Sequence, residues 1–327
     1  MQLRKVQEMG GATYLVSLPK GWARSASVKK GSIVSIEDSG DGGLLIYPVG
    51  AGSENSGKEI EIVYPSKFSG LSNEITAAYL LGYDLIRIKG NYLISSKDRD
   101  QILSSIKKLI GLEIVEEDAR SITSQFLVDK TVVEPSKIFR RISAIVRAMV
   151  SETIKQLTVE KSSSQFQTIA QRDDEVDRLH FLLVRLIRSA VQEPRSANKF
   201  GLSPIDCLDY RVAASSLETA GDYAVELSDV ISKIGGQVGP ETLAKLASSD
   251  KILESIIDNS SRGFVGRDFT LAQRAIDECR ALESLLDSLR ESDGRAFPEI
   301  LHILDILERI IRCNRDISDL IAPMHAA

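Results

Sequence analysis

Residues 217–231 read Leu-Glu-Thr-Ala-Gly-Asp-Tyr-Ala-Val-Glu-Leu-Ser-Asp-Val-Ile, and this pattern returns ninety positions later in the chain. The second copy keeps Leu-Glu at 307–308 and Asp-Ile-Ser-Asp-Leu-Ile at 316–321. A repeat at a fixed separation indicates that a structural unit has been duplicated. Each ninety-residue copy accommodates three helices, so we predict a duplicated three-helix bundle.

The repeat belongs to a longer segment, residues 135–325, that has helical periodicity almost throughout. One stripe of apolar residues at helical spacing consists of Ile138, Ile142, Ile145, Met149 and Val150. Breaks rich in Gly and Pro divide the segment into six long helices, and they lie at 193–194, 201–204, 235–240, 263–266 and 294–298. Long helices joined by short breaks pack as antiparallel bundles, which we assign to residues 135–233 and 234–325.

The first fifty residues have a different character. Three short apolar runs predict strands, and they lie at 14–18, 33–36 and 44–47. Asp38-Ser-Gly-Asp-Gly-Gly43 predicts a hairpin between the last two, because glycine tolerates the positive φ of tight turns. Residues 19–24 allow one helical turn at most. A module of this size buries too little surface to be stable alone, so we expect residues 1–50 to dimerise.

Residues 53–57 read as a linker, and residues 58–133 then alternate between strand and helix patterns. The expected strands are 60–63, 85–88, 114–115 and 122–127, and the expected helices are 71–81 and 98–110. This β-α-β-α-β-β order predicts an α/β middle domain, for which a ferredoxin-like fold is one candidate. Its role is open between a spacer and a ligand sensor.

The distribution of charge limits the kinds of partner. The chain has 327 residues, enough for two or three domains, and a formal net charge of -5. Residues 1–50 hold six basic and four acidic side chains, a net +2, which leaves -7 for the rest. This balance excludes a uniformly basic nucleic-acid coat but allows a local DNA-facing patch, because phosphate contacts dominate affinity. A solvated basic rim explains the same charge equally well.

The cysteines and the missing motifs narrow the function class further. Cys207, Cys279 and Cys313 are far apart in apolar-periodic stretches, so we expect reduced packing residues in a cytoplasmic protein. We expect neither a signal peptide nor a membrane span. Nucleophile elbows, phosphate-binding loops and HExxH are absent from the sequence, and three histidines leave little basis for a histidine-based active site. We therefore do not expect an enzyme.

The N-terminal module resembles a known DNA-binding family. The similarity lies in Arg4-Lys-Val6, Tyr14-Leu-Val-Ser-Leu-Pro-Lys-Gly-Trp22, Val28-Lys-Lys-Gly-Ser-Ile-Val34 and Leu44-Leu-Ile-Tyr-Pro48. These elements, in this order, resemble the AbrB/SpoVT/MazE-type DNA-binding domain over almost all of residues 1–50. The resemblance implies a swapped-hairpin β-barrel built by two chains. It also implies DNA contacts by Arg4, Lys5, Lys20, Arg24 and Lys30.

The helical half offers two pairs of acids. Asp173 and Asp177 are four residues apart, as are Glu218 and Asp222, so the members of each pair share a helix face. If the two helices lie side by side, four carboxylates surround one site. Oxygen ligands of this kind suit Mg²⁺, Mn²⁺ or Fe. The alternative is a pair of solvated helix faces. Gly221, unusual inside a helix, allows close helix approach.

The same acids carry a second resemblance. Asp173-Asp-Glu-Val-Asp-Arg-Leu179 and Leu217-Glu-Thr-Ala-Gly-Asp-Tyr-Ala224 resemble the acidic motifs of PhoU, a family of phosphate-uptake regulators. The similarity extends over roughly residues 135–322, with Thr219 where the family motif has arginine. It implies a metal ion (Fe, Zn, Mn or Mg) on these acids. It also implies control of phosphate uptake through the phosphate transporter and its sensor kinase.

The second half departs from the family pattern. Arg312 stands where the repeat calls for the aspartate that pairs with Glu308, and residues 275–286 contain no clean DxxxD. We therefore expect a Glu308–Arg312 ion pair and at most one of the two metal sites of the family.

Four further polar residues on the first acidic helix invite two interpretations each. His180 follows Asp177 at the spacing that di-iron bundles use, but the matching histidine on the second helix is missing. We therefore expect a helix-surface histidine. Arg178, Arg185 and Arg188 can form a basic stripe for a partner, although ion pairs at solvent positions are the simpler expectation.

Together these features favour a dimeric or larger transcription regulator that binds DNA through its head and senses phosphate status through its helical region. A second hypothesis is an adaptor that does not bind DNA and restrains a phosphate ABC transporter, with the head serving only for dimerisation. A third is a carboxylate-bridged metal enzyme in the first bundle. An antitoxin role fits the head but not the long body.

Overall fold

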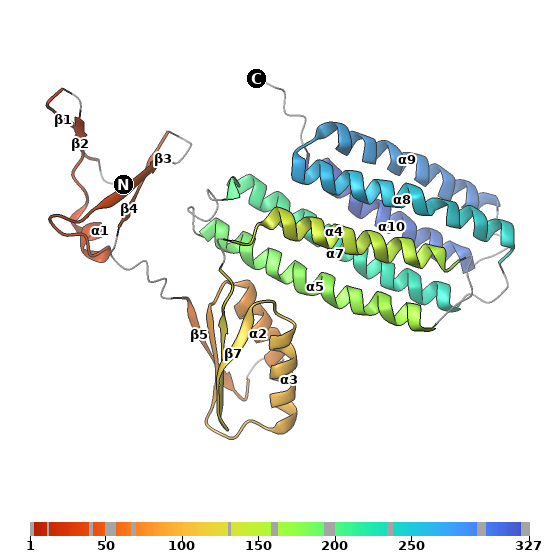
Figure 1. Cartoon of the computed structure of the whole chain (residues 1–327), viewed down its shortest axis with the longest axis horizontal. Helices are drawn as coiled ribbons and strands as arrows, with labels where there is room; N and C mark the ends of the chain where they lie inside the picture. The colour runs from red at the N-terminus through yellow and green to blue at the C-terminus, as the bar shows by residue number, and fades with distance from the viewer. Residues whose placement is uncertain are drawn as a thin grey trace. The chain divides into compact units, whose positions relative to one another are not determined.

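The computed structural model describes ten segments of the chain: residues 3–11, 13–38, 42–49, 57–66, 70–129, 132–157, 163–192, 200–233, 238–292 and 299–321. Two compact units are present, Met1–Gly57 and Lys58–Ala327. Figure 1 shows both units and labels most of their elements.

The first unit consists of two small hairpins and one short helix. β1 (Gln7–Met9) pairs antiparallel with β2 (Thr13–Leu15), and β3 (Val34–Asp38) pairs antiparallel with β4 (Leu44–Pro48). The hairpin predicted around residues 38–43 is confirmed by the β3–β4 register. β1 was not predicted, and its turn is made by Gly10 and Gly11, both at positive φ. α1 (Lys20–Ser25) has six residues and so exceeds the single turn expected.

The first unit has no core of its own in the residues that the structure describes. None of the described residues between 3 and 49 is buried. Its exposed large apolar side chains are Leu3, Val6, Met9, Tyr14, Leu15, Val16, Ile33, Ile36, Leu44 and Val49. The apolar positions that the sequence pattern assigns to a core therefore face solvent in a single chain.

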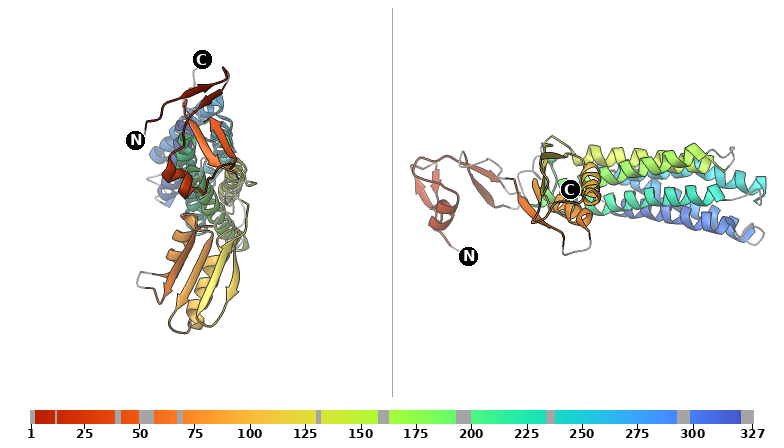
Figure 2. Two further views of the ribbon diagram at one scale, coloured as in Figure 1. Left: turned by 90° about the vertical axis from the view of Figure 1, so that its left-hand side faces the viewer. Right: turned by 90° about the horizontal axis from the view of Figure 1, so that it is seen from below.

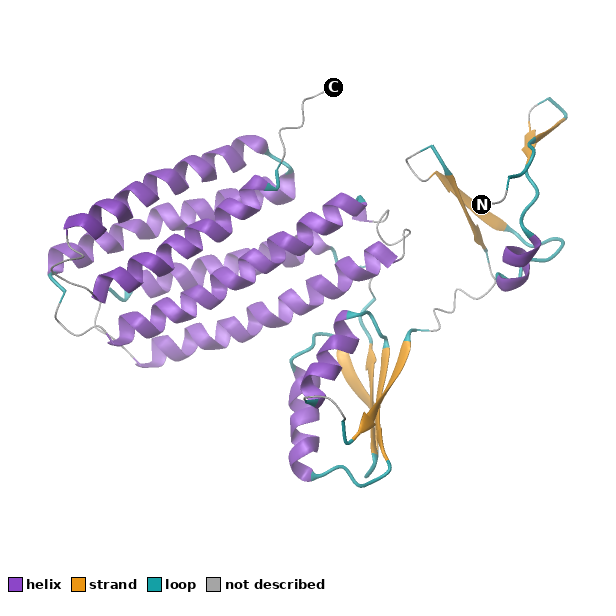
Figure 3. Cartoon of the chain, turned by 180° about the vertical axis from the view of Figure 1, so that it is seen from behind, coloured by secondary structure: helices purple, strands orange, loops and turns teal. Residues whose placement is uncertain are grey.

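The second unit begins with a two-layer α/β domain. Its elements are β5 (Glu59–Tyr64), α2 (Leu71–Leu80), β6 (Leu85–Gly90), α3 (Ser96–Lys107), β7 (Leu112–Glu117) and β8 (Ser121–Phe126). This confirms the predicted β-α-β-α-β-β order. Figure 3 shows α2 and α3 on one face of the sheet.

The sheet differs from that of a ferredoxin-like domain. Its strand order is β5-β6-β8-β7, with β5 parallel to β6 and β8 antiparallel to both of its neighbours. A ferredoxin-like domain has the order β-α-β-β-α-β along the chain. In this domain α3 lies between β6 and β7 along the chain, and a direct hairpin joins only β7 to β8. The position of α3 in the chain therefore accounts for the difference in topology.

Six long helices follow in the described part of the chain, which is the expected number, although one boundary differs from the predicted breaks. They are α4 (Pro135–Lys155), α5 (Ser163–Gln192), α7 (Pro204–Lys233), α8 (Pro240–Gly266), α9 (Phe269–Ser292) and α10 (Glu299–Asp319). The boundary between α4 and α5 was not among the predicted breaks, because residues 156–162 contain neither Gly nor Pro.

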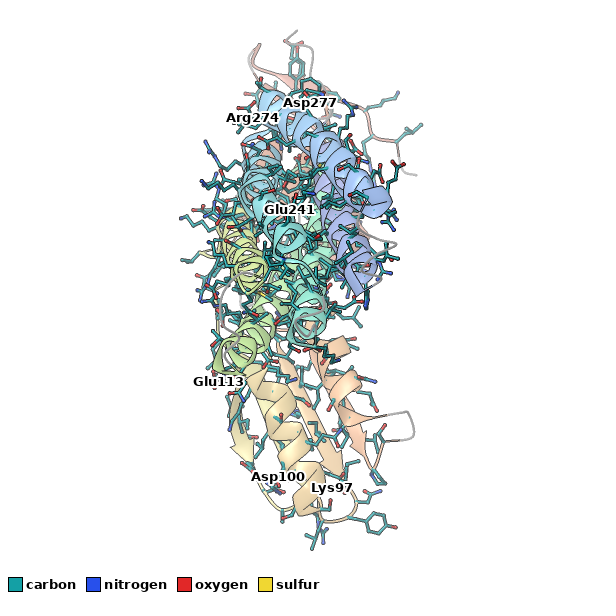
Figure 4. All side chains as sticks on the ribbon, turned by 90° about the vertical axis from the view of Figure 1, so that its right-hand side faces the viewer. Lys97, Asp100, Glu113, Glu241, Arg274 and Asp277 are labelled. Atoms are coloured by element: carbon teal, nitrogen blue, oxygen red, sulfur yellow. The ribbon has the colours of Figure 1, made fainter. Side chains whose placement is uncertain are left out.

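The helices pack in two connected groups. α4, α5 and α7 contact one another, and so do α8, α9 and α10. In addition α4 packs on α8 and α7 packs on α10 (Figures 1 and 2). The outward face of α9 is charged, with Arg274 and Asp277 exposed on it (Figure 4).

A buried arginine joins α5 to the α/β domain. Arg185 has no exposed surface, and its guanidinium donates hydrogen bonds to the carbonyls of Tyr79 (2.6 Å) and Tyr83 (2.9 Å) and to Asp84 Oδ1 (2.7 Å). The guanidinium also lies 4.0 Å from the centre of the Phe126 ring. The expectation of a solvent position for Arg185 is therefore wrong. The Tyr79 carbonyl also accepts a hydrogen bond from Gly82 N, so Arg185 adds to the backbone bonds at the end of α2 and in the turn that follows it.

The cysteines and the absence of a membrane span were also predicted from the sequence. Cys207, Cys279 and Cys313 are free and buried, which confirms that they are packing residues. No helix in the described segments has both the length and the apolar character needed to cross a membrane.

Candidate functional site

The four predicted carboxylates come from two adjacent helices. α5 carries Asp173 and Asp177, α7 carries Glu218 and Asp222, and the two helices pack against each other. One oxygen each of Asp177, Glu218 and Asp222 lies within 4.8 Å of the other two. Asp177 and Glu218 are partly buried, whereas Asp222 is exposed. The structure thus brings three of the four predicted ligands together.

Asp173 borders this group of three. Its Oδ1 atom is buried and has no hydrogen-bond partner. A Cβ atom added to Gly221 would lie 3.5 Å from that oxygen and 3.6 Å from Val146 Cγ2, which are ordinary contacts. The close approach of α5 and α7 therefore leaves room for a methyl group, and Gly221 is not sterically required at this point.

The electrostatics of the acid cluster (Asp173, Asp177, Glu218 and Asp222) are unfavourable to four negative charges. Burial, followed by repulsion from neighbouring carboxylates, raises the pKa of Asp173 to about 6 and that of Glu218 to about 7. Burial also raises the pKa of Asp177 and of Asp222. No Lys or Arg of the described residues forms an ion pair with any of the four within 4.0 Å. A cation bound here would relieve this repulsion.

His180 lies one turn after Asp177 and is buried rather than on the helix surface, so the surface expectation is wrong. Its Nδ1 atom is 3.8 Å from Glu218 Oε1, and neither ring nitrogen has a hydrogen-bond partner. Burial lowers the pKa of His180 to about 4, so the ring is neutral at pH 7. A neutral imidazole with unpaired nitrogens is a common metal ligand. His180 thus stands beside the cluster as a further donor.

This donor set fits a divalent cation. Partly buried carboxylate oxygens that lack cationic partners are the ligands that Mg²⁺ and Mn²⁺ favour. An imidazole nitrogen beside them extends the range to Fe and Zn. The raised carboxyl pKa values indicate that the site has more negative charge than its surroundings stabilise.

On the corresponding helices of the second half, an arginine neutralises the acids. Arg290 of α9 donates hydrogen bonds to Asp305 (3.0 Å) and Glu308 (2.5 Å) of α10. The expected Glu308–Arg312 pair is therefore wrong, because Arg290 reaches Glu308 from the facing helix. In the described residues, Asp177, Glu218 and Asp222 form the one group of three potential ligands that could hold a metal ion.

The candidate DNA-binding residues lie on the surface of the first unit. Lys20 and Arg24 are one turn apart on α1, and both are exposed. The remaining candidates, Arg4, Lys5 and Lys30, are also exposed and lie outside the helix and the strands. One face of α1 therefore presents two positive charges.

Two family models match the chain, one in each unit. Residues 139–231, which contain all four carboxylates, match the PhoU domain. Over these residues the chain is similar to a PhoU domain. Residues 8–54 match the model described as antidote-toxin recognition MazE, bacterial antitoxin. Both resemblances seen in the sequence are therefore confirmed over the matched residues, and the acid cluster on α5 and α7 lies within the PhoU match.

Comparison with whole proteins adds a distant similarity. The crystal structure of PhoU from Pseudomonas aeruginosa is 17% identical to this chain, and the match covers 57% of this chain and 93% of that one, with a TM-score of 0.47. No curated protein matches the chain.

Proposed function

We propose that this protein is a phosphate-responsive DNA-binding transcription regulator of phosphate uptake. The observation that carries the proposal is the presence of a MazE-type domain and a PhoU domain in one chain. A MazE-type head supports DNA binding, and a PhoU domain supports a role in phosphate-related regulation. A protein that joins a DNA reader to a sensor needs no separate partner to transmit the signal.

The head would act as a dimer. Its described residues include no buried side chain, although ten large apolar side chains are present. Burying such side chains contributes roughly 25 cal/mol for each Å² removed from water, so pairing with a second copy would provide the missing core. Dimerisation would also double the number of exposed basic residues that face a duplex.

The PhoU domain would hold one divalent cation on Asp173, Asp177, Glu218 and Asp222, with His180 adjacent. When bound, the ion supplies the positive charge that the cluster lacks. The chain's own residues hold α5 and α7 at the distance at which these oxygens converge. Arg185, farther along α5, connects the same helix to the carbonyls of Tyr79 in α2 and of Tyr83 just after it. A change in α5 would therefore reach the α/β domain directly.

DNA binding can be tested by fluorescence anisotropy on the full chain. The fragments come from upstream of its own gene and of phosphate-transport genes, with scrambled fragments for comparison, over a series of salt concentrations. The test variant changes Arg4, Lys5, Lys20 and Arg24 to Glu. The control changes the exposed residues Lys89, Lys97, Lys233 and Lys251 to Glu, so the two variants have the same net charge.

We expect tight binding to specific fragments with a steep salt dependence, lost in the head variant and retained in the control. Equal, weak binding by all three proteins would overturn the regulator proposal. The adaptor that restrains a phosphate transporter would then be the better hypothesis, and pull-down with transporter subunits would follow.

A further inference from the structure

A groove runs between α7 and α10, on a different face of α7 from the acid cluster. Its volume is ≈ 630 Å³. From α7 it is lined by Arg211, Val212, Ser215, Ser216, Thr219 and Tyr223, and from α10 by Arg309, Arg312, Cys313 and Asp316. The two helices pack along their length and their ribbons lie side by side in Figure 1.

The groove has an excess of positive charge. Three arginines line it against a single carboxylate, Asp316. Arg309 lies 3.8 Å from Glu226 and 5.6 Å from the centre of the Tyr223 ring. Among the described residues, no carboxylate oxygen lies within 4.0 Å of a nitrogen of Arg211 or Arg312.

Other arginines of the second half are paired. Arg274, Arg280 and Arg290 of α9 and Arg315 of α10 each form an ion pair with a nearby acid. Arg312 also occupies the position that corresponds to Asp222 in the repeat, ninety residues earlier. The second copy of the repeat therefore has a positive charge at this position, and no acid of the described residues pairs with it.

The other polar groups of the groove complement the arginines. Ser215, Ser216, Thr219 and Tyr223 each offer a hydroxyl that can donate to an oxyanion. Guanidinium groups bind phosphate oxygens in a bidentate manner, and such charge-assisted bonds are roughly twice as strong as neutral ones. The volume falls within the range of about 300–1,000 Å³ that is typical of small-molecule sites.

We propose that this groove binds a phosphorylated small molecule, whose phosphoryl oxygens are held by Arg211, Arg309 and Arg312 and by the hydroxyls of α7. The site goes beyond the proposed function, since it is separate from the acid cluster and does not depend on DNA binding. The groove shares α7 with Glu218 and Asp222 of the cluster.

The test is isothermal titration calorimetry on the full chain with inorganic phosphate, AMP and ADP as probes. The test variant is Arg309→Gln with Arg312→Gln. Both side chains are exposed, so the fold should tolerate the change. The matched control is Arg262→Gln with Arg280→Gln, two exposed arginines on α8 and α9 that do not line the groove.

We expect at least one probe to bind the wild type, with affinity reduced at least about tenfold in the groove variant and unchanged in the control. Equal affinity for phosphate and the nucleotides would identify the free anion as the ligand, and tighter binding of a nucleotide would identify the phosphorylated nucleoside.

The proposal fails if no probe binds or if the groove variant binds as well as the control. It also fails if binding is lost in Asp177→Asn and kept in the groove variant, because the anion would then bind at the acid cluster. None of these results depends on DNA, so they do not decide the regulator proposal, which the DNA-binding experiment tests separately.

Discussion

The α5–α7 pair and the α9–α10 pair occupy equivalent places in the two halves of the helical region, yet they handle charge in opposite ways. In α9–α10, Arg290 neutralises Asp305 and Glu308, and Arg315 neutralises Glu283. In α5–α7, the four carboxylates of the acid cluster have no such partner among the described residues. The acids of one pair have cationic partners, whereas those of the other have none among the described residues.

The difference has an energetic consequence. Partly buried carboxylates without partners repel one another and resist ionisation, which destabilises the folded state at neutral pH. Packed helices with internal ion pairs avoid this destabilisation but offer no binding site. The two halves thus pack their helices alike but differ in whether the facing acids have a cationic partner.

The largest effect is expected at the one arginine of α5 that is fully buried. Arg185 contacts the α/β domain rather than the acid cluster, and Arg185→Met would remove its hydrogen bonds to Asp84 and to the carbonyls of Tyr79 and Tyr83. We expect a loss of about 3–5 kcal/mol in the free energy of unfolding, as for other broken buried pairs. Urea denaturation measures it, with Arg188→Met, which loses one hydrogen bond, as the milder comparison. Equal losses in the two variants would contradict the structural role of Arg185.

The second prediction removes the internal balance of α9–α10. Arg290→Met leaves Asp305 and Glu308 without a cation, and we expect about 1–2 kcal/mol of destabilisation. The control is Arg280→Met, which breaks an exposed pair with Asp277 and should change stability by no more than about 0.5 kcal/mol. If both variants are equally stable, the pairs of α9–α10 do not stabilise it and the contrast with α5–α7 disappears.

The third prediction concerns pH. The pKa of Glu218 is raised to about 7 in the folded protein, above its ordinary value of 4.5, so the folded state holds this proton more tightly than the unfolded state. Its ionisation therefore destabilises the metal-free fold progressively from about pH 4.5 to about pH 7. Glu218→Gln should match the wild type near pH 4 and exceed it in stability above pH 7. Thermal unfolding in the presence of a chelator, across this pH range, measures the difference. A constant difference at all pH values would show that Glu218 does not titrate as described.

The smallest effect is expected at Gly221. An added Cβ would make only ordinary contacts of 3.5–3.6 Å with Asp173, Val176 and Val146, and alanine favours the helix by up to about 1 kcal/mol. Gly221→Ala should therefore stabilise the protein slightly, which chemical denaturation would detect. A clear destabilisation would mean that α5 and α7 approach more closely than the structure shows.

The regular elements could be predicted from the sequence where a local signal exists. The β3–β4 hairpin follows from the glycines of residues 38–43, and most helix boundaries follow from Gly and Pro. The α4–α5 boundary lacks both residues and was missed. β1 was also missed, although Gly10-Gly11 is the kind of dipeptide that marks a tight hairpin turn.

The candidate site could likewise be predicted from the sequence only in part. The i, i+4 spacing places each acid pair on a helix face, and it predicts the cluster once α5 and α7 pack together. It does not show which cation, if any, reaches an acid from a facing helix, so Arg290 was not expected to neutralise Glu308. Arg185 offered one signal that was overlooked, since it is the single charged residue in Phe181–Ile187. A lone charge in an apolar run indicates a buried partner.

Metal binding tests the contrast between the two helix pairs most directly. The measurement is titration of the full, metal-free chain with Mn²⁺ and Mg²⁺ by calorimetry, in the wild type, in Asp177→Asn with Glu218→Gln, and in the matched control Glu283→Gln with Glu308→Gln. We predict one bound ion per chain in the wild type and in the control, and at least about a hundredfold loss of affinity in the α5–α7 variant. Equal binding by all three proteins, or binding lost only in the control, would contradict the assignment of the acid cluster as the cation site.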